Sequence, residues 1–318
     1  ESWLPDQFKP LRLLGTGGMG EVWLATETIS GNSVAVKRQR LDLPEAEASS
    51  ARLRFKREFL VISKLEHPGM VRAYSLHESE RSLCYTMDFV DGWPLKEYFS
   101  AGNWNGQGMA NWPLDAEGLA RLWAVGNELL AGLEYLHRAG FVHRDLKPVN
   151  VMVNREGRVK LIDFGLAKPE QQDLAITGAG EVLGTPSYLA PEQIRGLPLD
   201  GRADLYATGI LLYELAAGTL PFTAKTTVEV LLAHLQQAPS PPREKNPAIA
   251  PEIGAFLLRL LAKEPAGRFV SAESARRALR ALAAGEASGS AQLSATTALP
   301  VVAGIARLLA PPFIGNET

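Results

Sequence analysis

Apolar and polar residues alternate along much of residues 8–90, and apolar residues recur at helical spacing through most of residues 115–284. Alternation with a period of two predicts strands, because successive side chains of a strand point to opposite faces of a sheet. The chain is therefore expected to begin with a sheet and to continue as a mainly helical region. The expected strands span residues 8–14, 21–26, 33–37, 70–77 and 83–90.

One helix is predicted among these strands, over residues 46–65, and His67-Pro68 is expected to stop it because proline cannot continue a helix. Asp115 is the predicted N-cap of a longer helix that reaches about Arg138. The leucines of that helix recur at helical spacing, which indicates packing in a core rather than around a cofactor. Later helices are predicted over residues 205–217, 226–236, 251–262 and 271–283.

Turn-forming residues mark the expected boundaries. Residues 100–115 are rich in glycine and asparagine and predict a surface insertion. Gly, Ala, Ser and Thr dominate residues 285–297, which predicts a linker. Residues 298–318 are a short apolar tail, for which a docked helix is expected and a membrane-proximal segment at 298–310 is the alternative. Residue 1 is Glu, so the sequence is expected to be a fragment, and any membrane anchor is otherwise expected outside it.

The composition narrows the classes of function. With 318 residues the chain is long enough for two lobes, and a net charge of -2 with a pI of about 6.3 disfavours nucleic acid as a partner. Cys84 is the single cysteine, which excludes an intramolecular disulfide and a multi-cysteine zinc site and fits a reducing compartment. A small buried residue is expected at this position. The histidines show no H-E-x-x-H pairing, which argues against a transition-metal site.

The densest group of chemically active side chains lies in the stretch 143–150, His-Arg-Asp-Leu-Lys-Pro-Val-Asn. Pro148 blocks helix continuation and holds the residue before it in an extended geometry. Asp145, Lys147 and Asn150 are therefore expected to project from an irregular loop, which is where catalytic groups commonly lie.

A second acidic position, Asp163-Phe164-Gly165, follows the strand-like residues 159–162. Together the two motifs resemble those of the protein kinase superfamily, whose pattern is H-R-D-L-x-x-x-N followed by D-F-G. The chain resembles a eukaryotic-type Ser/Thr protein kinase, and most closely the bacterial members of that family.

The resemblance implies an α+β, bilobal protein kinase fold, with a small, mainly β N-lobe that carries one regulatory helix and a larger, mainly α C-lobe. It covers residues 8–284, with the N-lobe at about 8–90 and the C-lobe at about 91–284.

A glycine-rich turn between two predicted strands matches the kinase lid over ATP phosphates, whereas a dinucleotide-binding fold would place a helix after the glycines. Met87 matches the gatekeeper position, and Asp88-Phe89-Val90 the hinge whose backbone meets adenine. The resemblance implies nucleotide contacts at Leu14, Gly15, Thr16, Gly17, Gly18, Met19, Gly20, Val22, Ala35, Lys37, Met87, Asp88, Val90, Asn150 and Asp163.

The resemblance also assigns catalytic roles. Lys37, paired with Glu58, is expected to hold the α and β phosphates of ATP. Asp163 and Asn150 are expected to bind Mg²⁺, with Mn²⁺ as an alternative. Asp145 would accept the proton of a Ser or Thr hydroxyl, and Lys147 would offset charge at the γ phosphate.

Regulatory and structural roles follow from the segment between the D-F-G motif and Ala190-Pro191-Glu192. Arg144 is expected to anchor a phosphate, for which Thr177 is the first candidate and Thr185 the second. Glu192 and Arg268 are expected to form a buried ion pair, and Asp204 to brace the catalytic loop.

Three alternatives stay open: a pseudokinase scaffold, a small-molecule phosphotransferase of the aminoglycoside type, and a non-enzymatic interaction module. The expected partners are proteins with Ser or Thr acceptors and a second copy of the chain for trans-autophosphorylation. The expected location is the cytoplasm, for a free protein or for the cytoplasmic domain of a membrane-anchored kinase.

Overall fold

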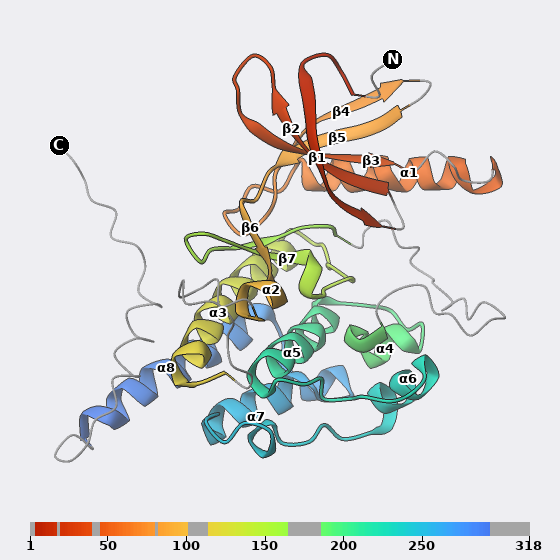
Figure 1. Ribbon diagram of the computed structural model, residues 1–318. Helices are drawn as coiled ribbons and strands as arrows, with labels where there is room; N and C mark the ends of the chain where they lie inside the picture. Colours follow the sequence, from red (N-terminus) through yellow and green to blue (C-terminus); the bar gives the residue numbers. More distant parts are fainter. Residues whose placement is uncertain are drawn as a thin grey trace, which may run out of the picture.

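The computed structural model describes residues 4–17, 20–39, 45–79, 82–100, 114–164 and 186–292, the side chains of 45–47 and 285–292 excepted. A sheet with one long helix lies above a mainly helical part in the view of Figure 1. The predicted α+β, bilobal architecture is therefore confirmed.

The upper sheet has five antiparallel strands in the order β1-β2-β3-β5-β4. Side-chain alternation along β3 explains why this sheet has two buried faces. Val34 and Val36 join Cys84 in one apolar cluster, whereas Ala35 joins the cluster that contains Tyr85. The buried Cys84 confirms the expectation of a small core residue. The strands are β1 (Phe8–Gly17), β2 (Gly20–Glu27), β3 (Ser33–Gln39), β4 (Ala73–Ser79) and β5 (Ser82–Asp88).

Helix α1 (Glu45–Ile62) carries Phe55 and Ile62 into the Tyr85 cluster. It ends three residues before the predicted end at 65 and well before His67-Pro68. The N–H groups of Lys64 and Leu65 bond to carbonyls three residues back, at 3.0 and 3.1 Å, which tightens and closes the last turn. The predicted stop signal was therefore placed too late.

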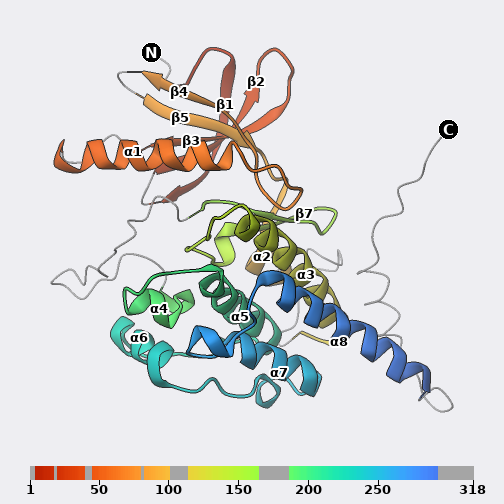
Figure 2. The ribbon, with the colours of Figure 1, turned by 180° about the vertical axis from the view of Figure 1, so that it is seen from behind.

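The lower part contains helices and a small sheet in the order β6-β7-β8. Helix α8 packs against α3 and lies in front of it in the reverse view of Figure 2. The helices are α2 (Leu95–Ser100), α3 (Ala116–Arg138), α4 (Pro191–Ile194), α5 (Gly201–Ala217), α6 (Thr227–Gln236), α7 (Pro251–Leu260) and α8 (Ala272–Gln292). The strands are β6 (Gly92–Pro94), β7 (Val151–Asn154) and β8 (Val159–Leu161). Short 3₁₀ turns are η1 (Pro148–Asn150), η3 (Pro186–Tyr188), η4 (Pro242–Glu244) and η5 (Pro265–Gly267).

Side-chain caps fix where the two central helices begin. Asp115 accepts a hydrogen bond from the N–H of Gly118 at 2.9 Å, so the predicted cap of α3 is confirmed. Asp200 caps α5 in the same way, which starts that helix at Gly201 rather than at the predicted 205. A Cβ at Gly201 would lie 2.5 Å from the ring of His137, so glycine permits the close packing of α5 on α3.

Two predicted boundaries need comment. Helix α8 continues to Gln292, so residues 285–292 of the predicted linker are helical. This stretch holds two glycines and two serines against two alanines, so its composition indicated a linker, whereas the helix runs through it. Residues 101–113 of the predicted insertion and the tail after 292 lie outside the described residues. Within the described residues, none of the helices has the length and apolar character that a membrane span requires.

Candidate active site

The catalytic loop is held from below by Asp204, in the first turn of α5. Its carboxylate accepts the N–H groups of His143 and Arg144 at 2.8 and 2.9 Å, and it contacts Nε2 of His137 at 2.7 Å. Burial would raise the pKa of Asp204, but these hydrogen bonds and the nearby imidazoles hold that pKa below its ordinary value. Arg144 has a φ of 65°, an uncommon conformation for a non-glycine residue, and the two bonds to Asp204 hold the backbone there.

Above this anchor, Lys147 and Asn150 both contact Asp145. Nζ of Lys147 lies 2.9 Å from Oδ2 of Asp145, and Nδ2 of Asn150 donates to the Asp145 carbonyl at 2.8 Å. The same nitrogen lies 3.2 Å from Asp145 Oδ2. The η1 turn produces this arrangement, since residues three apart in a 3₁₀ turn share one side. These contacts thus hold Asp145 in place within the catalytic loop.

Lys37 joins the two lobes. Its ammonium lies 2.7 Å from Glu58 Oε1 on α1 and 2.7 Å from Asp163 Oδ1, which follows β8. Burial would lower the pKa of Lys37, but the charges of Asp163 and Glu58 raise that pKa well above its ordinary value. The predicted Lys37–Glu58 pair is therefore present, and the lysine stays charged in any ordinary buffer.

Asp163 itself is positioned by its neighbours. The N–H of Ile162 donates to the Asn150 carbonyl at 3.0 Å, which ties the strand end to the catalytic loop. Phe164 is buried, and its ring centroid lies 5.1 Å from that of His143. Asp163 therefore reaches Lys37 while Phe164 packs into the core beneath, and Gly165 lies outside the described residues.

The glycine-rich turn joins β1 and β2 above this site. A Cβ added at Gly15 or Gly17 would meet nothing within 4 Å, so the protein itself does not demand glycine there. Gly20 differs, because its φ is 146° and a Cβ would lie 1.8 Å from the Arg38 carbonyl oxygen. Leu14 and Val22 are partly buried against the core on either side of the turn. Gly18 and Met19 lie outside the described residues.

The predicted hinge lies where β5 leaves the sheet. Met87 pairs with Ala35 of β3, and both residues are buried. The carboxylate of Asp88 accepts from the N–H of Arg72 at 3.2 Å, from the Tyr74 hydroxyl, and from Lys160 Nζ at 3.3 Å. Burial and the neighbouring Asp88 raise the pKa of Tyr74 to about 12, so that hydroxyl stays a donor. The backbone N–H of Asp88 is also bonded, since it donates to the Arg72 carbonyl at 2.9 Å, and Val90 follows two residues later.

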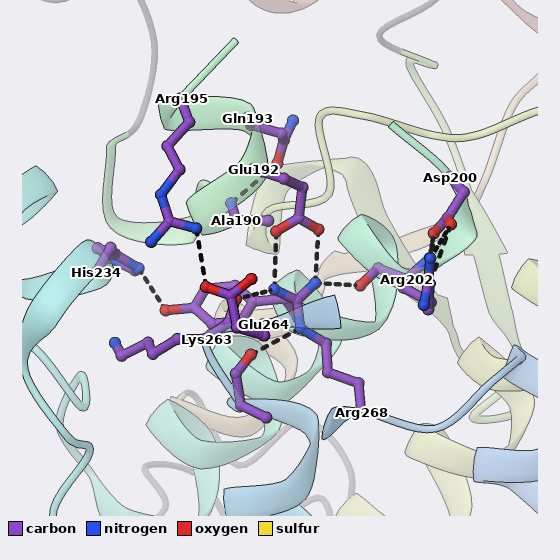
Figure 3. A network of polar contacts seen from close by, with 12 residues as sticks. Ala190, Glu192, Gln193, Arg195, Asp200, Arg202, His234, Lys263, Glu264 and Arg268 are labelled. Atoms are coloured by element: carbon purple, nitrogen blue, oxygen red, sulfur yellow. Dashed lines mark hydrogen bonds and ion pairs between the residues drawn. The ribbon is translucent and has the colours of Figure 1, made fainter. Parts of the chain in front are cut away.

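The second predicted ion pair lies in the helical lobe (Figure 3). Arg268 contacts Glu192 with two parallel bonds, Nη1 to Oε1 at 2.6 Å and Nη2 to Oε2 at 2.8 Å. The remaining guanidinium N–H groups donate to backbone carbonyls, including Nε to Ala262 at 2.8 Å. This bidentate pair is the geometry in which arginine binds a carboxylate most strongly.

Sequence reasoning missed several contributors. Tyr85 donates its hydroxyl to Glu58 Oε1 at 2.9 Å, and His137 supports Asp204. Gln193 links the catalytic loop to the segment before α4, because its amide donates to the Arg144 carbonyl at 2.9 Å and accepts from the Ala190 N–H at 3.0 Å. All three act between segments far apart in the chain, and no local pattern marks such pairs.

Of the three predicted regulatory residues, the structure describes only Arg144. Thr177 and Thr185 lie outside the described residues. Arg144 lies beside the catalytic loop, and within the described part of the chain its buried Nε has no hydrogen-bond partner.

The chemistry of the donor set fits a hard divalent cation. Asn150 uses its amide nitrogen toward Asp145, which leaves its Oδ1 for a ligand, and Asp163 keeps a carboxylate that is 36% exposed. Mg²⁺ prefers such carboxylate and amide oxygens. Among the described residues there is no cluster of three or more His, Cys, Asp or Glu side chains of the kind that holds a transition metal.

A bilobal fold in which the catalytic loop and the Asp163 segment lie at one site is that of a protein kinase. Residues 8–279 match the protein kinase domain family, so the chain belongs to that family. This confirms the resemblance to eukaryotic-type Ser/Thr kinases of bacteria.

Several curated relatives of the chain are bacterial kinases. The probable serine/threonine-protein kinase SCO3848 of Streptomyces coelicolor is 39% identical over 282 residues, which cover 87% of this chain and 40% of that protein. PrkC of Bacillus subtilis is 34% identical over 270 residues, which cover 85% and 39%. The chain thus spans less than half the length of these relatives.

Among solved structures, a mutant form of the PknI kinase domain of Mycobacterium tuberculosis has a TM-score of 0.62 and 28% identity. The match covers 87% of this chain and 96% of that one, so the likeness extends over both lobes.

Proposed function

We propose that this domain is an ATP-dependent serine/threonine protein kinase, which transfers the γ-phosphoryl group of ATP to Ser and Thr hydroxyls of proteins. The observation that carries the proposal is the contact of Lys37 with both Glu58 and Asp163, each at 2.7 Å. Three segments from two lobes converge there beside the catalytic loop, and phosphoryl transfer depends mainly on such positioning and charge.

In this proposal Asp145 binds the acceptor hydroxyl and accepts its proton. The hydroxyl oxygen forms a bond to the γ phosphorus while the bond from that phosphorus to the bridging oxygen breaks, which releases ADP. Lys147, 2.9 Å from the Asp145 carboxylate, lies close enough to offset charge on the transferred group.

Nucleotide and metal are assigned to the remaining groups. Lys37 would contact the α and β phosphates, and the open space over Gly15 and Gly17 would admit the phosphate chain close to the backbone. Asp163 and Asn150 would hold Mg²⁺, or Mn²⁺, and the cation would neutralise negative charge on the phosphates. The hinge after Met87 would receive adenine through the backbone of Asp88 and Val90.

The alternatives fit the site less well. A pseudokinase would not need Lys147 and Asn150 to contact Asp145 at 2.9 and 2.8 Å. A small-molecule phosphotransferase would not need the Ala190–Glu192 segment that Gln193 ties to the catalytic loop. That connection favours a protein substrate, which docks over an extended surface.

Regulation is proposed to act through Arg144. Phosphorylation of Thr177 by a second copy of the chain would add a charge of about -1.5 to -2, which a guanidinium binds in bidentate fashion. Thr185 is the weaker candidate, because a hydroxyl there is expected to contact the catalytic aspartate and lysine directly. Because the reaction uses ATP, the domain is proposed to work in the cytoplasm, either free or anchored through segments outside residues 1–318.

Incubation of the purified chain with Mg-ATP and a generic basic protein, followed by mass-spectrometric mapping of phosphosites, tests the proposal. Transfer to Ser and Thr is expected in the wild type and is expected to fall by about 10²–10⁴-fold in Asp145→Asn, since a general base contributes that factor. An exposed acid in the same lobe, Glu252→Gln on α7, is the matched control and should leave the rate unchanged. A wild type that phosphorylates nothing, or an Asp145→Asn variant of wild-type rate, would contradict it.

A further inference from the structure

The segment between α1 and β4 joins the upper lobe to strand β8 of the lower lobe. Within it, the Gly69 carbonyl accepts from the Leu161 N–H at 2.8 Å, and the Val71 N–H donates to the Leu161 carbonyl at 3.1 Å. These bonds form a parallel bridge between Met70 and Leu161, which are both buried. This part of the upper lobe is therefore fixed to β8 through the backbone.

The hinge is attached to the same segment. The Asp88 N–H donates to the Arg72 carbonyl at 2.9 Å, and Oδ2 of Asp88 accepts from the Arg72 N–H at 3.2 Å. The Asp88 carboxylate also accepts from the Tyr74 hydroxyl on β4. The hinge, residues 69–72 and β8 therefore lie in a row, and each is bonded to the next.

Lys160 spans this row from β8. Its Nζ donates to the Met70 carbonyl at 3.1 Å and lies 3.3 Å from Oδ2 of Asp88. An ammonium group has three N–H donors, so a single lysine can bind both acceptors at once. The side chains of Lys160 and Asp88 are 27% and 25% exposed, and a partly exposed ion pair contributes little to folding stability. What this contact fixes is the position of the hinge relative to β8.

Both ends of the Lys160 contact lead to groups assigned to the nucleotide. Asp88 begins the hinge that is proposed to receive adenine, and Asp163, three residues after Lys160, is proposed to hold the metal. One Mg-ATP molecule must reach both places at once, so its affinity depends on the spacing between them. Adenosine reaches only the hinge, where Arg72 and Tyr74 hold Asp88 without Lys160.

Building on the proposed function, we propose that Lys160 is a positioning residue for the nucleotide: its ammonium sets the spacing between the adenine-binding hinge and Asp163. Removal of the ammonium leaves the main-chain bonds in place but loosens this spacing, so Mg-nucleotide loses affinity. The chemical step keeps its rate once nucleotide is bound, because Lys147 and Asn150 hold Asp145 from within the catalytic loop.

Isothermal titration calorimetry of the full chain with adenosine and with a non-hydrolysable Mg-ATP analogue tests this, together with kcat and the KM for ATP in phosphorylation of a generic basic protein. Lys160→Met should raise the Kd of the Mg-nucleotide and the KM for ATP by roughly three- to thirtyfold, the range for a residue that couples two sites. The Kd of adenosine and kcat should each change by less than about twofold, because ground-state binding is lost rather than transition-state binding. The melting temperature should fall by no more than about 4 °C.

Arg158→Met supplies the matched control. Arg158 lies directly before β8, and its partly exposed ion pair with Glu128, at 3.1 Å, leads to α3 rather than to the hinge. Its nucleotide affinities should equal those of the wild type.

Three results would overturn the inference while the kinase activity stands. They are a Lys160→Met variant that binds the Mg-nucleotide as tightly as the wild type, an equal loss of affinity for adenosine, and the same loss in Arg158→Met. A wild type that binds no Mg-nucleotide would overturn the proposed function and this inference with it.

Discussion

Two buried ion pairs with different surroundings lie in the two lobes. Arg268 and Glu192 form a bidentate pair whose side chains are 0% and 6% exposed, and the other guanidinium N–H groups reach backbone carbonyls. Lys37 divides its ammonium between Glu58 and Asp163, and the Asp163 side chain is 36% exposed. In the described part of the chain, Oε2 of Glu58 has no hydrogen-bond partner.

This difference in surroundings indicates the role of each ion pair. A fully satisfied, bidentate pair inside one lobe has no group left for a ligand, so its contribution is to the fold. The pair of Lys37 bridges β3, α1 and the residues after β8, and it keeps one partner open to solvent. Such an arrangement can exchange a carboxylate contact for phosphate oxygens without leaving a buried charge uncompensated. We therefore expect stability to depend on the first pair and phosphoryl transfer on the second.

The largest effect is expected where the first pair is broken. Glu192→Gln leaves Arg268 buried with an uncompensated charge, which costs about 3–5 kcal/mol of unfolding free energy. The melting temperature should fall by at least about 6 °C in a domain of this size. Thermal unfolding followed by circular dichroism measures this. Glu264→Gln removes the exposed partner of Arg195 and should change stability by less than about 1 kcal/mol. Equal melting temperatures for Glu192→Gln and the wild type would refute the assignment.

The second pair should respond in the opposite way. Lys37→Met is expected to lower the rate of transfer by about 10²–10³-fold, the usual cost of removing one charged contact to the reacting group. Its melting temperature should fall less than that of Glu192→Gln, because Asp163 is 36% exposed and burial raises the pKa of Glu58, which lets that carboxyl take up a proton once the lysine is gone. Lys64→Met, an exposed lysine just beyond α1, is the matched control and should keep full activity. A Lys37→Met enzyme with more than a tenth of the wild-type rate would remove the contrast between the two pairs.

Much of this contrast could be predicted from the sequence, because the decisive signals are local. Asp115 marks the start of α3 by the chemistry of a cap, and its bond to Gly118 is present. The alternation through Val34, Ala35 and Val36 predicted β3, which ends near Lys37 as expected. The partners Glu58, Glu192 and Arg268 came from the resemblance to kinases, since their separation along the chain has no periodicity.

The remaining features depend on contacts that no short window contains. Helix α5 begins four residues early because Asp200 caps it, and only glycine fits at position 201 because His137 of α3 lies against it. Tyr85 and Gln193 became parts of the site through bonds to Glu58 and to the Arg144 carbonyl. Helix α8 reaches Gln292 through the glycines and serines that suggested a linker, and helix propensity does not account for this extension.

The Arg268–Glu192 pair also lies near a buried histidine, whose protonation makes the stability of this lobe depend on pH. His234 is buried and its Nδ1 lies 2.9 Å from the Tyr206 hydroxyl, next to the ring over which Arg268 stacks. Burial, together with the charge of Lys263, lowers the pKa of His234 to about 4 from an ordinary 6.5. Between these values the unfolded chain binds the additional proton, so stability is present above pH 6.5 and is lost as pH falls toward 4.

The unfolding free energy should therefore decrease by roughly 1.5 kcal/mol from this residue between pH 6.5 and pH 5. Urea unfolding at both pH values measures it, and His234→Asn should remove that part of the slope whatever its own stability. Lys37 should not follow this titration, because its raised pKa keeps its ammonium charged throughout this range. An equal pH slope for variant and wild type would disprove the role of His234.

The smallest expected effect concerns regulation, which would connect the two regions through Arg144. The Arg144 carbonyl is held by Gln193 beside the Glu192 pair, its N–H by Asp204, and its buried Nε lacks a partner among the described residues.

If a phosphate on Thr177 binds that guanidinium, Thr177→Ala and Arg144→Ala should each lower the rate by roughly tenfold, equivalent to about 1.4 kcal/mol. The double variant should be no slower than either single one, because both changes remove the same contact. Prior treatment with a phosphatase should bring the wild type to the same low rate and leave Arg144→Ala unaffected. Rates of peptide phosphorylation with parallel phosphosite mapping decide the matter: an unmodified Thr177 in an active wild type, or additive losses in the double variant, would show that Arg144 serves only the geometry of the catalytic loop.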